Sequence, residues 1–221
     1  MSYADSGTGS VDVVRILGRS SSLFTRVPRI FAEELGIRYV LEPIYDMTAT
    51  DPAAYGGNPA LKLPSLRRGE SLLFGAHNIC LALAEMSGAP RRIVWPEQLR
   101  DDLSRNAHEL VWHAMGAQVQ LVFGTVVAKL PADNVYFAKG RAGLDNSLRW
   151  LDRHAIQIMS SLPARDISLL EVSLFCLVEH LMFRATLPLA PYPALLAFRE
   201  AFGARPSALQ TQYQFDAPAS G

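Results

Sequence analysis

A proline opens one of the predicted strands of this chain, in the segment 58–66, which reads NPALKLPSL. Proline cannot donate a ladder hydrogen bond, so it is tolerated only at the start, the edge or a bulge of a strand. Pro64 is therefore a candidate for a cis peptide bond, which is usually a tight-turn feature. A cis bond would hold the backbone N–H and C=O of Leu63 out of the sheet, ready to pair with an extended, peptide-like ligand. An ordinary loop proline is the alternative.

The composition is typical of a folded protein and shows no excess of basic residues that would favour binding to a polyanion. Hydrophobic residues make up 49% of the 221 residues and charged residues 19%, so a core can form and disorder is not expected. Basic and acidic residues number 21 each, which argues against a nucleic-acid partner. No stretch of 18 uncharged apolar residues is present, and we expect no membrane span. Residues 1–10 lack the features of a secretory signal and predict a short disordered tail.

The two cysteines, Cys80 and Cys176, lie far apart among apolar residues at helical spacing. There is no C-x-x-C pair of the thioredoxin redox type. We expect both to be buried structural thiols. Because nothing here depends on oxidation, the cytoplasm is the expected compartment.

The first part of the chain predicts a small α/β layer. Apolar alternation and turn residues predict four strands and two helices: strands at 11–17, 38–44, 64–67 and 71–74, and helices at 22–35 and 75–87. Ser22 can cap the first helix, although Pro28 weakens the prediction at its start. The order β-α-β followed by β-β-α fits four strands with helices on the faces of the sheet.

From about Glu97 onward the pattern is helical, with no strand signal that stands out. Helices are predicted at 97–129, 134–162, 168–186 and 192–202. In the segment 168–171, Ser168 and Glu171 predict a capping box, in which each side chain bonds the backbone N–H of the other. The predicted organisation is a tail at 1–10, a domain at 11–88, a linker at 89–96 and a helical domain at 97–221.

Four segments, in this order and at these intervals, resemble the cytosolic glutathione transferase family over residues 11–209. They are the strand, turn and helix at 17–27, the proline segment at 58–66, the capping box at 168–171 and the closing helix with its Arg-Pro tail at 192–207. The resemblance implies an α/β thioredoxin-like N-terminal domain and an all-α helical-bundle C-terminal domain. It also implies a homodimer, a glutathione site in the first domain and an adjoining apolar pocket for an electrophile.

The resemblance places a catalytic hydroxyl at the start of the first helix. Conjugation needs a thiolate, and a hydroxyl beside the free N–H groups of a helix N-terminus can stabilise one. Ser22 occupies the matching position, with Ser21 or Ser20 as substitutes if the register shifts. The alternative is that these serines only cap and solubilise the turn. No cysteine stands here, which disfavours the thiol-transfer and dehydroascorbate-reducing branches of the family.

The resemblance assigns the cysteinyl part of glutathione to Leu63 and Pro64. At the next helix the chain departs from the family pattern, because Gly75 and Ala76 stand where an acidic residue and a serine are usual. Their N–H groups could still bind a carboxylate, and His77 follows at once. Loss of bonds to the charged end of the ligand could cost on the order of several kcal/mol in binding.

Two arginines, Arg19 and Arg26, flank the predicted site. Either guanidinium could bind a carboxylate with two hydrogen bonds. Solvated positions are the alternative for both.

A substrate pocket is predicted from Phe24 and from the helix that carries His108, Trp112 and Met115. His108 and Trp112 are four residues apart and share a helix face, and aromatic and methionine side chains suit an adaptable apolar pocket. A core-facing helix explains the same pattern. His108 and His113 are five apart and off one face, so no metal site is predicted.

Two functions remain open from the sequence. The first is a glutathione transferase-like enzyme that conjugates the glutathione thiol to an electrophilic, largely apolar small molecule. The second is a non-catalytic binding or scaffolding protein of the same fold, suggested by Gly75 and Ala76 at the usual polar positions. Neither a nucleic acid nor a membrane is an expected partner.

Overall fold

A computed structural model describes residues 13–89 and 91–217, and the predicted tail at 1–10 lies outside them. The N-terminal part is a four-stranded mixed sheet in the order β2-β1-β3-β4. Strand β1 (Val14–Gly18) runs parallel to β2 (Tyr39–Pro43) and antiparallel to β3 (Ser65–Arg68). Strand β3 forms the predicted hairpin with β4 (Ser71–Phe74).

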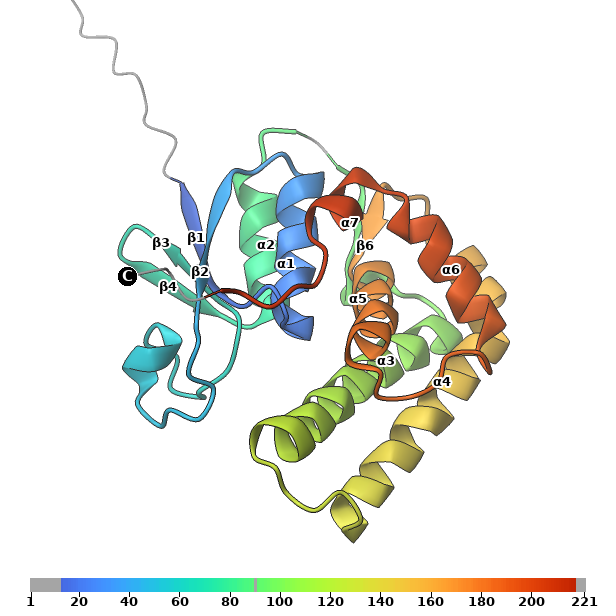
Figure 1. Cartoon of the computed structure of the whole chain (residues 1–221). Helices are drawn as coiled ribbons and strands as arrows, with labels where there is room; N and C mark the ends of the chain where they lie inside the picture. Colours follow the sequence, from blue (N-terminus) through green and yellow to red (C-terminus); the bar gives the residue numbers. More distant parts are fainter. Residues whose placement is uncertain (1–12, 90, 218–221) are drawn as a thin grey trace, which may run out of the picture.

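Helices α1 (Leu23–Glu34) and α2 (Ala76–Met86) lie side by side between the sheet and the helical half of the protein (Figure 1). Both helices turn apolar faces into the core, and α1 continues through Pro28. A single 3₁₀ turn, Pro52–Tyr55, connects β2 to β3 where the sequence predicts a turn-rich segment.

The C-terminal part is helical. Its elements are α3 (Asp102–Val122), a π-helical turn (Phe123–Val127), α4 (Val135–Ser161), α5 (Leu169–Arg184), α6 (Pro193–Gly203) and α7 (Pro206–Gln210). Helix α5 packs against α1, α3 and α6, and eleven of its sixteen residues are buried. The predicted fold class, a thioredoxin-like domain followed by an all-α bundle, is confirmed.

Three details differ from the sequence prediction. A two-residue strand, β6 (Ile167–Ser168), precedes α5 and pairs in parallel with β5 (Ile93–Val94), because two residues are too short to show a period. Helix α3 begins at Asp102, capped by the Asp101 carboxylate, and not at Glu97. The five residues of α7 are likewise too few for a helical pattern.

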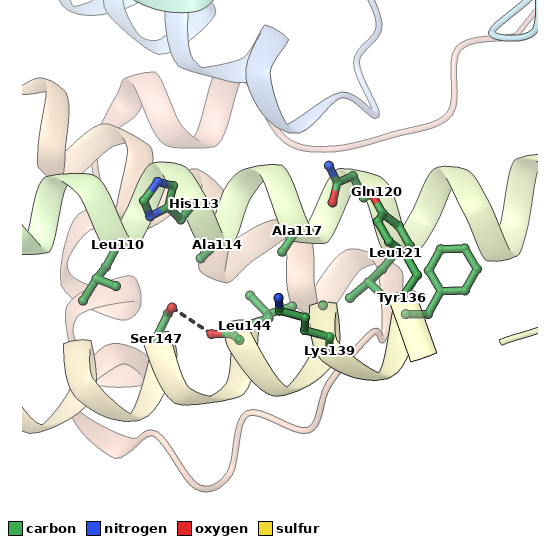
Figure 2. Close-up of a pocket in the computed structure, with 13 residues that line it drawn as sticks. Leu110, His113, Ala114, Ala117, Gln120, Leu121, Tyr136, Lys139, Leu144 and Ser147 are labelled. Carbon is green, nitrogen blue, oxygen red and sulfur yellow. Dashed lines mark hydrogen bonds between the residues drawn. The ribbon is translucent and has the colours of Figure 1, made fainter. Parts of the chain in front are cut away.

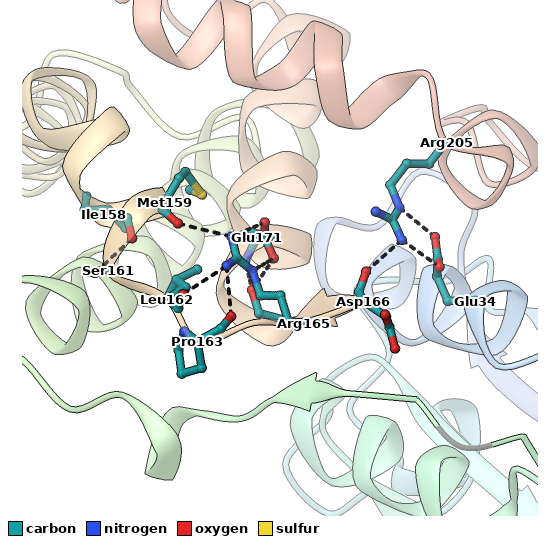
Figure 3. A network of polar contacts seen from close by, with 11 residues as sticks. Glu34, Ile158, Met159, Ser161, Leu162, Pro163, Arg165, Asp166, Glu171 and Arg205 are labelled. Carbon is teal, nitrogen blue, oxygen red and sulfur yellow. Dashed lines mark hydrogen bonds and ion pairs between the residues drawn. The ribbon is translucent and has the colours of Figure 1, made fainter.

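The predicted capping box at the start of α5 is half confirmed. The Glu171 N–H donates to Ser168 Oγ at 3.1 Å. The Glu171 carboxylate is bound by Arg165, whose Nε and Nη2 donate to it at 2.6 and 2.7 Å, and not by the Ser168 N–H (Figure 3). The charge of the guanidinium makes it the stronger donor.

The segment Asp102–Val127, which helix α3 and the π-helical turn form together, is long and apolar enough to cross a membrane by length and composition alone. Within this protein it packs against α4 and α5, and 39% of its most apolar window is buried. A core helix of a folded domain passes the same test of composition. Cys80 and Cys176 are both buried free thiols, as predicted.

Candidate functional site

A cavity of about 670 Å³ lies between the two halves of the protein. The N-terminal half contributes the start of α1 and residues of the loops 47–50 and 61–63. The C-terminal half contributes the end of α3, the π-helical turn, the start of α4 and the end of α5. The cavity is therefore complete only when the two halves pack together.

Four residues of the predicted site line this cavity, namely Ser22, its alternative Ser21, Phe24 and Leu63. Ser22 caps α1, since its Oγ accepts from the Thr25 N–H at 3.2 Å. Among the described residues the Ser22 hydroxyl donates to no protein acceptor, so its hydrogen is available to a ligand.

Ser20 is outside the lining and is 3% exposed. Its backbone N–H donates to the Asp216 carboxylate at 2.9 Å. The structure thus separates Ser20 from the predicted Ser22 and its alternative Ser21, which both line the cavity.

The peptide bond between Leu63 and Pro64 is cis. Strand β3 begins only at Ser65, and within the described part of the chain the N–H and C=O of Leu63 make no hydrogen bond to the protein. The Gly75 N–H donates to the Pro64 carbonyl at 3.1 Å. The start of α2 therefore adjoins the edge on which Leu63 presents its free backbone.

Helix α2 begins without a side-chain cap. Gly75 is the N-cap, at φ +85° and ψ +143°, and in the described residues the N–H groups of Ala76 and His77 have no acceptor. Free N–H groups at a helix N-terminus favour an anion. Gly75, Ala76, His77 and Pro64 lie outside the lining of the 670 Å³ cavity, so a ligand touching Ser22 and this helix end must extend beyond it.

The structure does not place His108, Trp112 or Met115 in the lining of the cavity. Met115 is fully buried, and Trp112 packs behind Phe24 with ring centroids 5.6 Å apart. The wall formed by α3 comes from its C-terminal end and includes Val119 and Val122, and the π-helical turn adds Phe123. Helical spacing shows which residues share a face, but not where along a helix of roughly 30 Å a cavity lies.

Arg26 is not a ligand-binding arginine, because it is enclosed by the protein. It is 1% exposed, and its Nη1 lies 3.3 Å from the Glu179 carboxylate. Its Nη2 donates to the Ala208 carbonyl at 3.0 Å, and its guanidinium lies over the rings of Phe175 and Tyr213. Arg19, the other predicted arginine, does line the cavity.

Two further lining residues, His180 and Arg184, come from α5. Burial lowers the pKa of His180 to about 3, with the nearby Arg184 charge acting in the same direction, so the ring is neutral. His180 Nδ1 lies 3.1 Å from Nε2 of Gln118, a fully buried residue of α3. No sequence signal links residues 118 and 180 to the serines at 20–22, because only packing brings them together.

A second cavity, of about 480 Å³, lies between α3 and α4 (Figure 2). Its lining includes Leu110, Ala114, Leu121 and Leu144, and no residue of the N-terminal half. None of the predicted catalytic, cofactor-binding or substrate-pocket residues lines it.

Together, the small mixed sheet, the cis-proline and the helical bundle define the glutathione transferase fold. A glutathione transferase family member from Pseudomonas fluorescens Pf-5, solved with bound glutathione, has a TM-score of 0.74 at 22% identity and covers 91% of this chain and 99% of its own. A glutathione S-transferase from Methylobacillus flagellatus, solved with GSH, has a TM-score of 0.72 at 20% identity, with 91% and 100% covered.

A third structure, the glutathione S-transferase from Methylobacterium radiotolerans in complex with glutathione sulfonate, has a TM-score of 0.67 at 20% identity and covers 94% of this chain and 98% of its own. No protein-family model and no curated protein matches this chain. At these identities the similarity establishes the fold, and the function rests on the site itself.

Proposed function

We propose that the protein is a glutathione transferase-like enzyme that conjugates the glutathione thiol to an electrophilic, largely apolar small molecule. One observation supports this most directly: the Ser22 hydroxyl at the start of α1 and the free backbone of Leu63 line the same cavity. The structural neighbours with glutathione or its sulfonate bound add support for the choice of co-substrate.

In this proposal Leu63 pairs through its backbone with the cysteinyl part of glutathione, beside Pro64. Ser22 donates its hydroxyl hydrogen to the sulfur and so lowers the pKa of the thiol. The N-terminus of α1 adds a favourable field for the thiolate. Phe24 and the end of α3 exclude water from the apolar substrate, which strengthens the interaction between Ser22 and the sulfur.

The α-carboxylate of the γ-glutamyl group is assigned to the free N–H groups of Ala76 and His77 at the start of α2. Gly75 leaves no side chain to pair with the ammonium group of the ligand. We therefore expect weaker glutathione binding than an acidic residue would allow.

The test is conjugation of glutathione to 1-chloro-2,4-dinitrobenzene, with glutathione binding measured separately by calorimetry. Ser22→Ala should lower kcat roughly 100-fold, as for removal of one donor to a developing anion, and should raise the pKa of the bound thiol. Ser22→Thr keeps a hydroxyl and a cap and should recover most of the activity, whereas Ser20→Ala should change kcat little. No binding at millimolar glutathione would refute the proposal.

The second candidate is a non-catalytic binding protein of this fold. The observation that favours it is Gly75 and Ala76 at the start of α2, where neither side chain can bind a charged ligand. This alternative predicts no conjugation by the wild-type protein. Activity that is lost in Ser22→Ala and recovered in Ser22→Thr would exclude it.

We also infer a homodimer, expected to be cytoplasmic, with no nucleic-acid or membrane partner. The π-helical turn and the start of α4 carry exposed apolar side chains, among them Val126 and Val135. Light scattering coupled to gel filtration should give twice the chain mass of 24.3 kDa. A monomer at micromolar concentration would contradict this part of the proposal.

A further inference from the structure

The cavity between the two halves concentrates positive charge in an otherwise balanced protein. Arg19, Lys62 and Arg184 line it, and no aspartate or glutamate does. The whole chain has 21 basic and 21 acidic residues, so this imbalance is local. Most of the remaining lining is apolar, including Leu23, Phe24, Val119, Val122 and Phe123.

Arg19 and Arg184 have no counter-ion in the described part of the protein. Neither forms a salt bridge or a side-chain hydrogen bond there, and the Nε atom of each is buried without a partner. Asp216, which reaches the same turn, bonds the Ser20 N–H instead. Both arginines are half-buried, and a cation that loses part of its hydration is normally paired with an anion, because the lost hydration is otherwise uncompensated.

The Arg184 guanidinium lies over two aromatic rings. Its carbon Cζ lies 5.1 Å from the ring centroid of Phe183 and 4.9 Å from that of Phe215. Contact with aromatic rings uses none of the N–H donors of the guanidinium, and a planar guanidinium matches the two oxygens of a carboxylate. Burial lowers the pKa of Arg184, and the charge of Arg19 lowers it further, so an anion between them would relieve their repulsion.

We propose that the apolar ligand of this cavity carries a carboxylate, bound between Arg19 of the turn before α1 and Arg184 at the end of α5. This inference rests on the proposed function only in identifying that ligand as the electrophilic second substrate. The apolar part of the molecule then contacts Phe24 and the end of α3, near the Ser22 hydroxyl. Since the two arginines come from different halves, this carboxylate site forms only when the halves pack together.

The experiment is calorimetric titration with 1-naphthylacetate and its neutral analogue 1-naphthylacetamide, with and without saturating glutathione. The proteins are the wild type, Arg19→Gln, Arg184→Gln and the double variant. Arg153→Gln, at an exposed arginine of α4, is the matched control. Binding of the amide reports whether the cavity remains folded in each variant, independently of charge.

The wild type should bind the acid at least about tenfold more tightly than the amide, as expected for charge-assisted hydrogen bonds. Each single variant should reduce this ratio, the double variant should bring it to about one, and Arg153→Gln should leave it unchanged. A wild-type ratio near one, or an unchanged ratio in the double variant, would overturn the inference.

Competition between the acid and glutathione would also overturn it, since the arginines would then serve the carboxylate of glutathione itself. A different result separates the two proposals. If the acid is preferred in an arginine-dependent way and glutathione does not bind at all, the anion site stands and the transferase function fails.

Discussion

The carboxylate of Asp216 accepts a hydrogen bond from the backbone N–H of Ser20 at 2.9 Å, across 196 residues of chain. The C-terminal segment thereby reaches the turn that leads to Ser22 and α1. Nearby, the Tyr45 hydroxyl donates to the carbonyl of Ala217 at 2.9 Å. Residues 216 and 217 therefore support the turn that presents the proposed catalytic hydroxyl.

Replacing Asp216 with alanine should loosen this turn, because the buried Ser20 N–H loses its acceptor. We expect faster amide hydrogen exchange of Ser20 and its neighbours and a loss of about 1–3 kcal/mol of stability. The control is Asp133→Ala, at an exposed aspartate before α4. Unchanged exchange at Ser20 would show that the turn does not depend on the C-terminal segment.

Replacing Arg26 with methionine should destabilise the protein by about 3 kcal/mol in urea unfolding. The guanidinium contacts Glu179 and the Ala208 carbonyl, and an apolar side chain leaves that carbonyl unsatisfied. Glu179 keeps Arg199 as a partner, which limits the loss. Arg26→Lys should also destabilise the protein, since an ammonium group cannot reproduce the contacts of the planar guanidinium. The control, Arg100→Met at an exposed site, should have little effect.

Arg205 and Glu34 join α7 to α1 through two hydrogen bonds of 2.8 Å (Figure 3). A double-mutant cycle with alanine at both positions should give a coupling of about 1 kcal/mol at pH 7, since the pair is partly solvent-exposed. Burial alone would raise the pKa of Glu34, but hydrogen bonds from Arg205 and Ser207 outweigh it, and the pKa lies below 4.5.

The sign of the pH effect at this pair follows from the lowered pKa. The coupling should be complete above pH 4.5 and should disappear as the pH falls and Glu34 is protonated. A coupling that grows on acidification would contradict the assignment of this ion pair.

His180 should make the protein sensitive to mild acid. Its pKa of about 3 in the folded state lies below the ordinary value of 6.5, so its contribution to stability is present above pH 6.5 and is lost as the pH falls toward 3. Each pH unit in this range costs at most about 1.4 kcal/mol. The free energy of unfolding, measured in urea between pH 7 and 5, should fall less steeply with decreasing pH for His180→Gln than for the wild type.

Part of this pH dependence of the free energy of unfolding should remain in His180→Gln, because burial also lowers the pKa of His108. Identical slopes in the two proteins would show that the His180 ring accepts a proton without cost.

Replacing Gly75 with alanine should cost about 1 kcal/mol or more, because φ is +85° there and an L side chain rarely adopts that conformation. A methyl group at this position would meet no atom within 4 Å, so the cost comes from the backbone alone. Gly88 also has open space for a methyl group, without a positive φ, and Gly88→Ala should be neutral or slightly stabilising. Equal effects on thermal unfolding would contradict this account.

Short-range features could be predicted because they depend on neighbours in the chain. The capping of α1 by Ser22, the hairpin of β3 and β4 and the cis bond before Pro64 all follow from residues within a few positions of one another. The same reasoning missed β6 and α7, which are too short for a period to appear.

The amino-acid sequence by itself determined the strands of the small sheet, the long helices and the place where the chain departs from the glutathione transferase pattern. Only the tertiary structure decided that Arg184 faces the cavity beside Arg19, that Arg26 is enclosed, and that the pocket wall lies at Val119–Gly124 and not at Trp112. Hydrophobic periodicity predicts which face of a helix is buried. It does not predict which part of the helix lines a cavity or which residues of other elements lie beside it, because these depend on how the two halves of the protein pack together.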